Sequence, residues 1–371
     1  MTDSPQKILV FQPTIGTYRI DFFNMLAKCF DLKIYIEYDE SAFEIYNPDL
    51  WKNLLLCHPN ILQKSIKLKK RQLYKGYWSI IESYKPDIIL VSEFGINAIA
   101  SLAYKQLYRK KYKVISICDD SYDMLNNRRD FSKYHRILRK LIVPCLDNII
   151  LVEPESQRWY QEHYNKGIFF PIISDEARLR IEYEQALEIS NKYITEYSLK
   201  GKKIFLYVGR LIEIKNVESL IKAFKKIHSD DSKLVIVGDG NQANYLKELS
   251  SDNNNILFTG RLHGKELNAW YNIANALILP SFVEPFGAVT NEALIGGCKV
   301  LISNRAGSKC LIKNGINGFY INPADINDIA MNMQEALSTS IECPESAKLR
   351  KSLMLHSFND LFSDLIADIS R

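Results

Sequence analysis

The chain has 371 residues, of which 47% are hydrophobic and 25% are charged, and its formal net charge is +5. This length is too great for one ordinary hydrophobic core and predicts two domains, while the composition excludes a disordered chain. No run of about 18 apolar residues free of charge is present, so the sequence predicts no membrane span. The net charge is too small for a dedicated nucleic-acid binder, and we expect no nucleic-acid partner.

The cysteines and the N-terminus indicate an intracellular protein. The seven cysteines are scattered and form no C-x-x-C pair, which is typical of reduced thiols. The first residues lead into the apolar run at 8–11 without a basic start or a cleavage site, so we expect no signal peptide and a cytoplasmic location. The six histidines show no H-x-x-H or H-x-x-x-H spacing, and we therefore expect no metal site.

In the first half of the chain, short apolar runs alternate with stretches of helical periodicity. The runs are typical of buried parallel strands, and we expect strands at residues 8–11, 33–36, 88–91, 114–117 and 149–152. We expect helices at 18–30, 74–84 and 98–109. Strand and helix in alternation predict a doubly wound α/β sheet.

The alternation breaks at residues 171–200 and then restarts. Expected strands follow at 204–208, 234–237, 256–258, 276–279 and 299–302, and expected helices at 217–227, 243–250, 265–274, 287–295 and 326–336. The sequence thus predicts an N-terminal Rossmann-like domain at 1–170, a linker region at 171–200, a second Rossmann-like domain at 201–348 and a helical segment at 349–371. We expect the two domains to face one another, with the ligand in the cleft beyond the carboxyl ends of their strands.

The loop after the strand at 204–208 is the first candidate for a binding site. Gly209 lets a ligand approach the backbone, and the cations Arg210 and Lys215 can hold a diphosphate. Taken alone, the pattern is equally typical of two solvated cations in a loop. The next loops, Val237-Gly238-Asp239-Gly240 and Thr259-Gly260-Arg261-Leu262-His263, are weak signals alone, and the first lacks the G-x-G-x-x-G fingerprint of dinucleotide binding.

The segment from Leu279 to Leu294 carries the sharpest pattern. After a strand, a loop bears Glu284, and a helix is expected to open near Gly287 with Glu292 inside it. A helix N-terminus favours an anion, and a glycine there lets a phosphate come close. The two carboxylates would repel a phosphate, so we interpret them as acceptors for hydroxyl groups, Glu284 for a transferred sugar and Glu292 for a ribose.

Residues 207–325 resemble the nucleotide-binding half of retaining GT-B glycosyltransferases of family 4, the glycosyl transferases group 1. The motifs V-G-R-L-x4-N, V-G-D-G, the E-x7-E pair in E-P-F-G-A-V-T-N-E-A-L, and G-x-N-G-F at 315–319 stand in the family's order. The resemblance covers about a third of the chain and is specific as a set. It implies a GT-B fold in which residues 1–170 bind the acceptor and residues 201–348 bind a nucleotide diphosphate sugar as donor. It also implies retention of the anomeric configuration, and no metal or other cofactor.

The resemblance also assigns roles to single residues. It implies that Glu284, Arg210 and Lys215 carry the catalysis, and that the donor is bound by Gly16, Gly209, Arg261, Leu262, Phe286, Gly287, Ala288, Val289 and Glu292. Two departures from the family stand out. Asn216 replaces a glycine that many relatives have after the lysine, and the stretch at 117–122 has no histidine, which leaves Asp119 or Asp120 as a substrate contact.

The sequence therefore predicts transfer of a sugar, from UDP in preference to GDP, to a glycan or lipid-linked saccharide in polysaccharide biosynthesis. A sugar-nucleotide epimerase, a phosphorylase, and a non-catalytic binding protein of the same fold stay open as alternatives.

The basic charge of the chain lies in its first half. Residues 1–180 hold 27 Lys and Arg against 21 Asp and Glu, whereas the rest hold 21 against 22. Residues 64–78 mix six cations with aromatic side chains, a composition that suits peripheral contact with an anionic membrane and a lipid-linked acceptor. A solvated loop with a solvated helix face fits the same residues.

Overall fold

The structure is a computed structural model that describes residues 5–37, 54–68, 71–127, 132–227, 230–338 and 343–370, without the side chains of 66–68 and 71–73. The chain divides into two compact units. Unit 1 comprises Met1–Ser174 with Phe362–Arg371, and unit 2 comprises Asp175–Leu361. No helix of the described residues is long and apolar enough to cross a bilayer.

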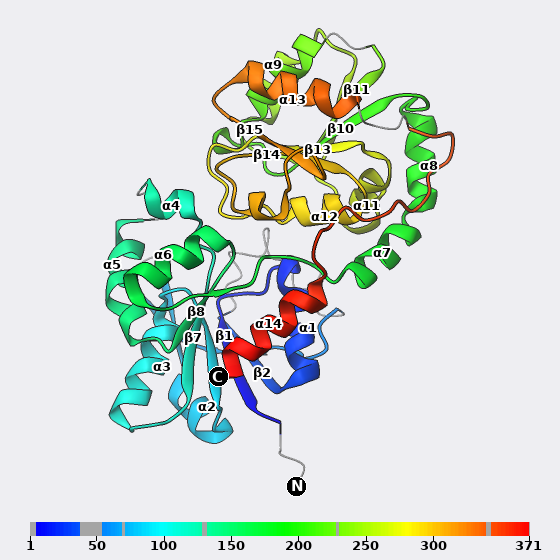
Figure 1. The fold of residues 1–371 in the computed structure, drawn as a ribbon. Coiled ribbons are helices and arrows are strands. Elements are labelled where there is room, and N and C mark those ends of the chain that lie inside the picture. Colours follow the sequence, from blue (N-terminus) through cyan, green and yellow to red (C-terminus); the bar gives the residue numbers. More distant parts are fainter. Residues whose placement is uncertain are drawn as a thin grey trace. The chain divides into compact units, whose positions relative to one another are not determined.

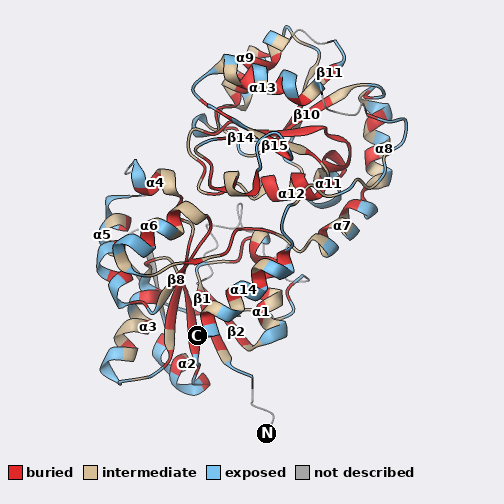
Figure 2. Ribbon diagram, in the orientation of Figure 1, coloured by how far each residue is buried: buried red, intermediate tan, exposed pale blue. Residues whose placement is uncertain are grey.

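Unit 1 is built on a parallel sheet of seven strands in the order β3-β2-β1-β6-β7-β8-β9 (Figure 1). The strands are β1 (Lys7–Gln12), β2 (Asp31–Ile36), β3 (Asn60–Ile61), β6 (Ile88–Ser92), β7 (Lys113–Cys118), β8 (Asn148–Leu151) and β9 (Ile168–Phe169). Its helices are α1 (Ile20–Cys29), α2 (Tyr77–Tyr84), α3 (Ile96–Leu107), α4 (Tyr122–Asn126), α5 (Lys133–Ile142) and α6 (Pro154–Tyr164), together with α14 (Phe358–Ser370) from Phe362 onward. β1 lies in the middle of the sheet, and its four residues from Ile8 to Phe11 are fully buried (Figure 2).

Unit 2 repeats this plan with a parallel sheet of six strands in the order β12-β11-β10-β13-β14-β15. The strands are β10 (Lys203–Val208), β11 (Ser232–Val237), β12 (Ile256–Gly260), β13 (Ala276–Leu279), β14 (Lys299–Ser303) and β15 (Gly318–Ile321). The helices are α7 (Glu176–Gln185), α8 (Leu187–Glu196), α9 (Val217–Ile227), α10 (Ala243–Leu249), α11 (Gly264–Ile273), α12 (Val289–Ile295) and α13 (Ile326–Ser338). Two Rossmann-like halves with parallel sheets confirm the predicted α/β fold class.

Three segments differ from the expectation. Residues 64–75 form an antiparallel pair, β4 (Gln63–Leu68) and β5 (Arg71–Lys75), where a loop and the start of a helix were expected. Lys69 and Lys70 of the predicted basic segment lie outside the described residues. The helix expected from residue 287 begins at Val289, because Gly287 adopts a φ of +98° that a right-handed helix excludes.

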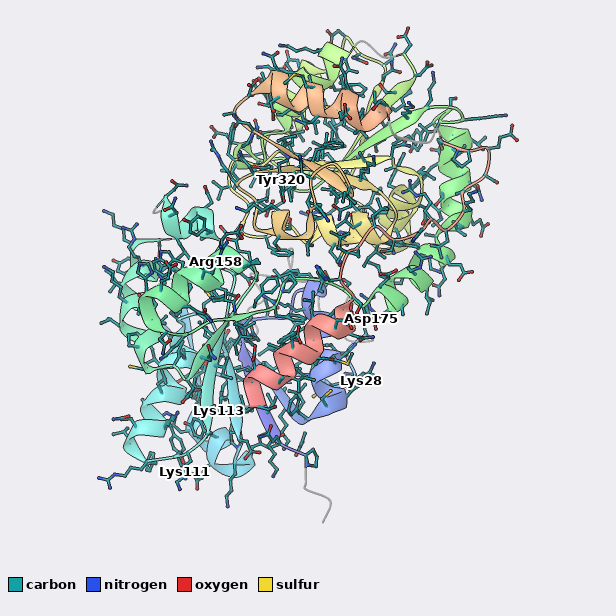
Figure 3. All side chains as sticks on the ribbon, viewed as in Figure 1. Lys28, Lys111, Lys113, Arg158, Asp175 and Tyr320 are labelled. Carbon is teal, nitrogen blue, oxygen red and sulfur yellow. The ribbon has the colours of Figure 1, made fainter. Side chains whose placement is uncertain are left out.

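The segment predicted as a linker is mostly a packed part of unit 2. Its helices α7 and α8 rest on α11, where Asn272 Nδ2 donates a hydrogen bond to the Tyr183 carbonyl at 2.8 Å. The ring of Tyr193 stacks on Trp270 with centroids 4.7 Å apart. Asp175 accepts a hydrogen bond from the Ala177 amide and so caps the first turn of α7, a position marked in Figure 3.

The last helix returns to unit 1. Phe362, 1% exposed, packs edge-on against Phe22 of α1 and Phe170, with ring centroids 6.2 and 5.8 Å away. At the end of α14, Lys113 Nζ donates hydrogen bonds to the Ile369 and Ser370 carbonyls at 3.3 and 3.1 Å (Figure 3). A cation at the final carbonyls of a helix is favourable, so the helix is fixed at both its middle and its end.

We expect Phe362→Ala to destabilise unit 1 by about 3–5 kcal/mol, since it removes a fully buried ring from an aromatic cluster. Hydrogen exchange should then show lost protection in β1 and α1, while the strands of unit 2 keep theirs. Leu355→Ala, at a side chain that is 45% exposed, is the control and should leave both units protected. Unchanged protection of α1 in the Phe362 variant would contradict this packing.

Candidate functional site

The carboxyl ends of β10 and β13 place the main candidate residues in one region of unit 2. The first strand of this unit, β10, pairs with β11 on one side and with β13 on the other, so the strand order reverses between β10 and β13. Loops that leave such a reversal point diverge and open a crevice, where ligands of doubly wound sheets bind. Arg210 and Lys215 follow β10, and Glu284 follows β13.

An ion pair joins the two loops. Lys215 Nζ lies 2.5 Å from Glu284 Oε2, and the two side chains are only 12% and 10% exposed. Ser281 Oγ donates a second hydrogen bond to the same oxygen at 3.3 Å. The structure therefore brings together two residues that the sequence assigned separately, and a ligand that contacts one of them meets the charge of the other.

Arg210 lies in the same loop after β10 as Lys215 and is exposed. Its backbone carbonyl accepts a hydrogen bond from the hydroxyl of Tyr207 at 3.0 Å. Burial raises the pKa of Tyr207, and the charge of Glu284 raises it further while Arg210 opposes that effect. The phenol thus stays neutral and holds the loop without adding charge to the site.

The glycines of the V-G-D-G loop serve backbone packing. A Cβ on Gly238 would lie 1.8 Å from the Gly209 carbonyl oxygen, and one on Gly240 would lie 2.3 Å from that of Leu211. Gly238 also has a φ of +145° and donates its N–H to the Gly260 carbonyl at 2.8 Å. These contacts bind the loops after β10, β11 and β12 into one layer. Arg261 is exposed and Leu262 half-buried at the end of β12.

The loop before α12 is held in the same way. Gly287 faces Leu279, whose Cδ2 would lie 2.6 Å from an added Cβ, and the Ser308 amide donates to the Phe286 carbonyl at 2.9 Å. Ala288 is the N-cap of α12, and Val289 begins its first turn. Phe286 itself is buried, so its side chain cannot contact a ligand in solvent.

Glu292 occupies the next turn of α12. Its Oε2 accepts a hydrogen bond from the Tyr271 hydroxyl at 2.7 Å, and its backbone carbonyl accepts one from Tyr183 at 2.8 Å. Burial raises the pKa of Glu292, although the Tyr271 bond and the charge of Arg178 oppose this. The carboxylate is therefore oriented by Tyr271 of α11, while Tyr183 of α7 holds the backbone of the same residue.

The structure shows why Asn216 can replace the glycine that many relatives have after the lysine. Its φ is +57°, in the left-handed region where a glycine is the usual residue. The side-chain amide donates to the carbonyls of Pro280 and Pro323 at 3.1 and 2.7 Å, and the residue is buried. Asparagine tolerates this conformation, and here it also ties the Lys215 loop to the strand end that leads to Glu284.

In unit 1 the structure separates Asp119 from Asp120. Asp119 is 30% exposed and forms an ion pair with Arg19 at 2.5 Å. The side chain of Asp120 is fully buried, accepts hydrogen bonds from Arg139 at 2.9 Å and Tyr160 at 2.6 Å, and lies 2.9 Å from His135 Nε2. Both oxygens of Asp120 thus serve the protein, and Asp119 is the exposed one of the two candidates.

The sequence reasoning missed His135 as a member of this group. Burial opposes the charge of Asp120, but the bond to His135 and the charges of His135 and Arg139 hold its pKa below the usual value. Burial also opposes charge on His135, yet its bond to Asp120 and the charges of Asp120 and Glu93 raise its pKa. The only sequence signal was the cap Ser132, which accepts from the His135 amide and starts α5 there.

Two further candidates need separate mention. Gly16 is buried after β1, and the ring of Tyr18 lies where its Cβ would be. His263 is exposed at the N-cap of α11. Among the residues that the structure describes, no group of three or more His, Cys, Asp or Glu side chains is arranged to hold a metal ion.

Comparison with known proteins gives a family match to this region of the chain. The family model described as glycosyl transferases group 1 matches residues 191–352, which contain every candidate residue of unit 2. Unit 2 carries a group 1 glycosyltransferase domain. This confirms the family resemblance read from the motifs of the same region.

Individual relatives of this glycosyltransferase domain cover the chain to different extents. An uncharacterized glycosyltransferase of Methanocaldococcus jannaschii is 36% identical over 141 residues, which is 37% of this chain and 36% of that protein. A GDP-mannose-dependent alpha-mannosyltransferase of Corynebacterium glutamicum is 25% identical over 265 residues, 67% of this chain and 59% of that protein. The matches thus span between about a third and three-fifths of these relatives' length.

Among solved structures, the Anabaena protein HepE in complex with UDP has a TM-score of 0.70. It is 14% identical, and the alignment covers 98% of this chain and 94% of that one. At this identity the similarity concerns the fold, and it extends over both Rossmann-like halves of the GT-B type.

We expect Asn216→Gly to cost about 1–3 kcal/mol of unfolding free energy, because two buried carbonyls lose their donor. Asn216→Ala should cost more, by about 1–2 kcal/mol, since alanine must also adopt a left-handed conformation. Urea unfolding of unit 2 measures both variants. If Asn216→Ala has a higher free energy of unfolding than Asn216→Gly, the left-handed backbone described at this position is contradicted.

Proposed function

We propose that the protein is a retaining, metal-independent glycosyltransferase that moves a sugar from a nucleoside diphosphate sugar, UDP-sugar in preference to GDP-sugar. The acceptor is a glycan or a lipid-linked saccharide, and the reaction serves polysaccharide biosynthesis in the cytoplasm. The observation that carries the proposal is the Lys215–Glu284 ion pair at the reversal point of unit 2, with Arg210 and Glu292 on the same edge.

The donor fits these residues by charge. Arg210 and Lys215 neutralise the diphosphate, the backbone of 286–289 approaches it, and Glu284 and Glu292 accept hydrogen bonds from sugar and ribose hydroxyls. Gly16, Gly209, Arg261 and Leu262 contribute the remaining contacts by family resemblance. HepE was solved with UDP, whereas the name of the corynebacterial relative specifies GDP-mannose, and nucleotide binding by this protein decides between the two.

In the proposed reaction the bond between the anomeric carbon and the diphosphate oxygen breaks, and the nucleoside diphosphate leaves with the electron pair. The acceptor hydroxyl oxygen forms the new bond on the same face, and its proton passes to an oxygen of the leaving phosphate. The protein supplies fixed charge for the departing diphosphate, which needs no reorganisation during the step.

The donor is tested by thermal unfolding of the protein with UDP, GDP, ADP and CMP in parallel. A ligand at about 100 times its dissociation constant adds about 2.7 kcal/mol of stability, and we expect UDP to give the largest shift. Arg210→Ala should lower turnover about 100-fold or more, the scale of removing one contact to developing negative charge. Because Arg210 is exposed, this variant should fold normally.

Lys222→Ala, which removes an exposed cation on α9, is the matched control and should keep wild-type turnover. Release of nucleoside diphosphate only when acceptor is present separates transfer from epimerisation, and NMR of the product in EDTA reports retention and metal independence together. Normal turnover of Arg210→Ala would remove this residue from the site, and stabilisation by none of the nucleotides would reject the donor assignment.

Peripheral membrane contact is supported by α5 as well as by the overall basic charge of the first half. Tyr134, Ile137 and Leu141 are spaced to lie on one side of α5 and are 73%, 54% and 66% exposed. Lys133 and Lys140 are exposed on the adjoining side, and residues 132–142 contain no Asp or Glu. An apolar stripe beside cations is the pattern of a helix that lies in an anionic membrane interface.

We expect the protein to co-sediment with vesicles of phosphatidylglycerol and phosphatidylcholine but not with vesicles of phosphatidylcholine alone. Leu141→Glu should abolish binding, because it places an acid in the apolar stripe next to the anionic lipid. Leu107→Glu, on α3 and also 66% exposed, is the matched control and should still bind. Equal loss in both variants, or wild-type binding without regard to anionic lipid, would refute α5 as the contact.

A further inference from the structure

Arg350 lies in the irregular segment 343–357 of unit 2 and binds the backbone of two helices. Its Nε donates a hydrogen bond to the Gly296 carbonyl at 3.0 Å, and its Nη2 donates one to the Tyr271 carbonyl at 2.6 Å. Tyr271 belongs to α11, and Gly296 is the C-cap of α12. The planar guanidinium presents its donors in a fixed geometry, so this one side chain joins α11 to α12.

Both contacts lie at the end of a helix. The last four carbonyls of an α-helix have no partner within the helix, and the helix dipole places partial negative charge on them. Tyr271 stands in the last turn of α11, and the following free amide, that of Asn275, donates to the Ile204 carbonyl in place of the helix. The charge of Arg350 strengthens each of its hydrogen bonds, so it stabilises both helix ends at once.

The backbone of Arg350 is itself held in place. Arg180 Nη1 donates to the Arg350 carbonyl at 2.8 Å, and the Leu353 amide donates to the Leu294 carbonyl of α12 at 2.8 Å. Gly297 has a φ of +76°, and an added Cβ there would lie 2.8 Å from that of Arg350. The segment therefore runs in close contact with the end of α12, and the guanidinium starts from a fixed position.

The two helices that Arg350 joins carry the pair formed by Tyr271 and Glu292 (Figure 1). The Tyr271 ring is fully buried, so it cannot follow a displaced carboxylate. A Cβ on Gly296 would lie 3.0 Å from the Tyr271 carbonyl oxygen, which shows that α12 touches α11 at this turn. Tyr183 holds α12 at the Glu292 carbonyl from α7, and Arg350 holds it at its end from the segment 343–357.

The bond between the two side chains is sensitive to the position of α12. The Tyr271 hydroxyl lies 2.7 Å from Glu292 Oε2. Because a hydrogen bond is no longer made beyond about 3.5 Å, a displacement of α12 by about 1 Å releases the carboxylate. A binding group is effective only when the groups behind it hold it in its productive orientation. The contact of Arg350 with both backbones is thus a condition for the orientation of Glu292.

We propose that Arg350 is a positioning residue for recognition of the donor's ribose: it fixes α12 against α11, so that Tyr271 aims the Glu292 carboxylate at the ribose hydroxyls. The inference rests on the proposed function, in which Glu292 accepts hydrogen bonds from the ribose. It adds to that site a residue that touches no ligand and lies outside the loops that follow the strands.

The test is calorimetric titration of the full-length protein with UDP and with 2′,3′-dideoxy-UDP, which lacks both ribose hydroxyls. GDP and 2′,3′-dideoxy-GDP are titrated alongside, so that the choice of base does not decide the outcome. We expect the wild type to bind the ribonucleotide about tenfold or more tightly than its dideoxy form, the scale of a hydrogen bond to a carboxylate. In Arg350→Met this preference should fall to about threefold or less, with the affinity for the dideoxy form unchanged, because the diphosphate contacts remain.

Further variants separate positioning from a general effect on stability. Arg350→Lys keeps the charge without the planar fork and should restore part of the preference. Gly297→Ala forces a Cβ against that of Arg350 and should weaken the preference as Arg350→Met does. Adding Arg350→Met to Glu292→Gln should cause no further loss, since both changes act through one contact. Lys351→Met, at the exposed neighbouring cation, is the matched control and should keep the full preference.

The outcomes distinguish this inference from the proposed function. A wild-type preference in Arg350→Met would overturn the inference alone, and so would equal weakening of the ribonucleotide and its dideoxy form. If Arg350→Met does not fold, a wild-type preference in both Arg350→Lys and Gly297→Ala has the same meaning. Absence of the preference in the wild type, or absence of nucleotide binding, overturns the ribose contact of the proposed function and this inference with it.

Discussion

The central position of the first strand of each unit is the constraint on which both candidate sites depend. β1 and β10 have hydrogen-bonded neighbours on both sides, and helices cover their faces, so their residues must be apolar. Polar chemistry can begin only where the strand ends. Arg19 and Arg210 follow these ends, and the reversal of strand order sends the flanking loops apart at the same points. The sheet topology therefore fixes the positions at which charged side chains can lie, with or without a bound ligand.

Charge is handled differently in the two units. In unit 2, Lys215 and Glu284 form a pair with almost no other bonds, in which each keeps capacity for a substrate. In unit 1, three side chains donate hydrogen bonds to Asp120, so both of its oxygens already have partners. A fully buried carboxylate is stable only when it is paired in this way. The first arrangement suits contact with a ligand, and the second suits support of neighbouring groups.

The strands and the donor loops could be predicted from sequence because their signals are local. Apolar runs such as 8–11 and 204–208 report burial directly, and glycines in V-G-D-G mark backbones that touch. His135 could not be found in this way, since it meets Asp120 only after α5 packs across the strand end. The two strands at 63–75 could not be predicted because their charged residues obscure the alternation of apolar and polar side chains. The helices within 171–200 are mostly polar, and only a few buried side chains, such as Tyr183, anchor them, so their sequence resembles that of a linker. The roles of the site residues stay predictions, since they concern a ligand.

The return of α14 to unit 1 has a consequence for how the protein is made. Phe22 meets Phe362, and nearly the whole chain lies between these two residues. During synthesis α14 leaves the ribosome only after unit 2 has emerged. Until then, the apolar side chains of unit 1 that α14 covers, such as Phe22, are exposed to water. Closing so long a loop adds little entropy cost per extra residue but delays folding. Until α14 emerges, Phe22 of nascent unit 1 therefore lacks its partner Phe362, whereas unit 2 is complete once Leu361 has been made.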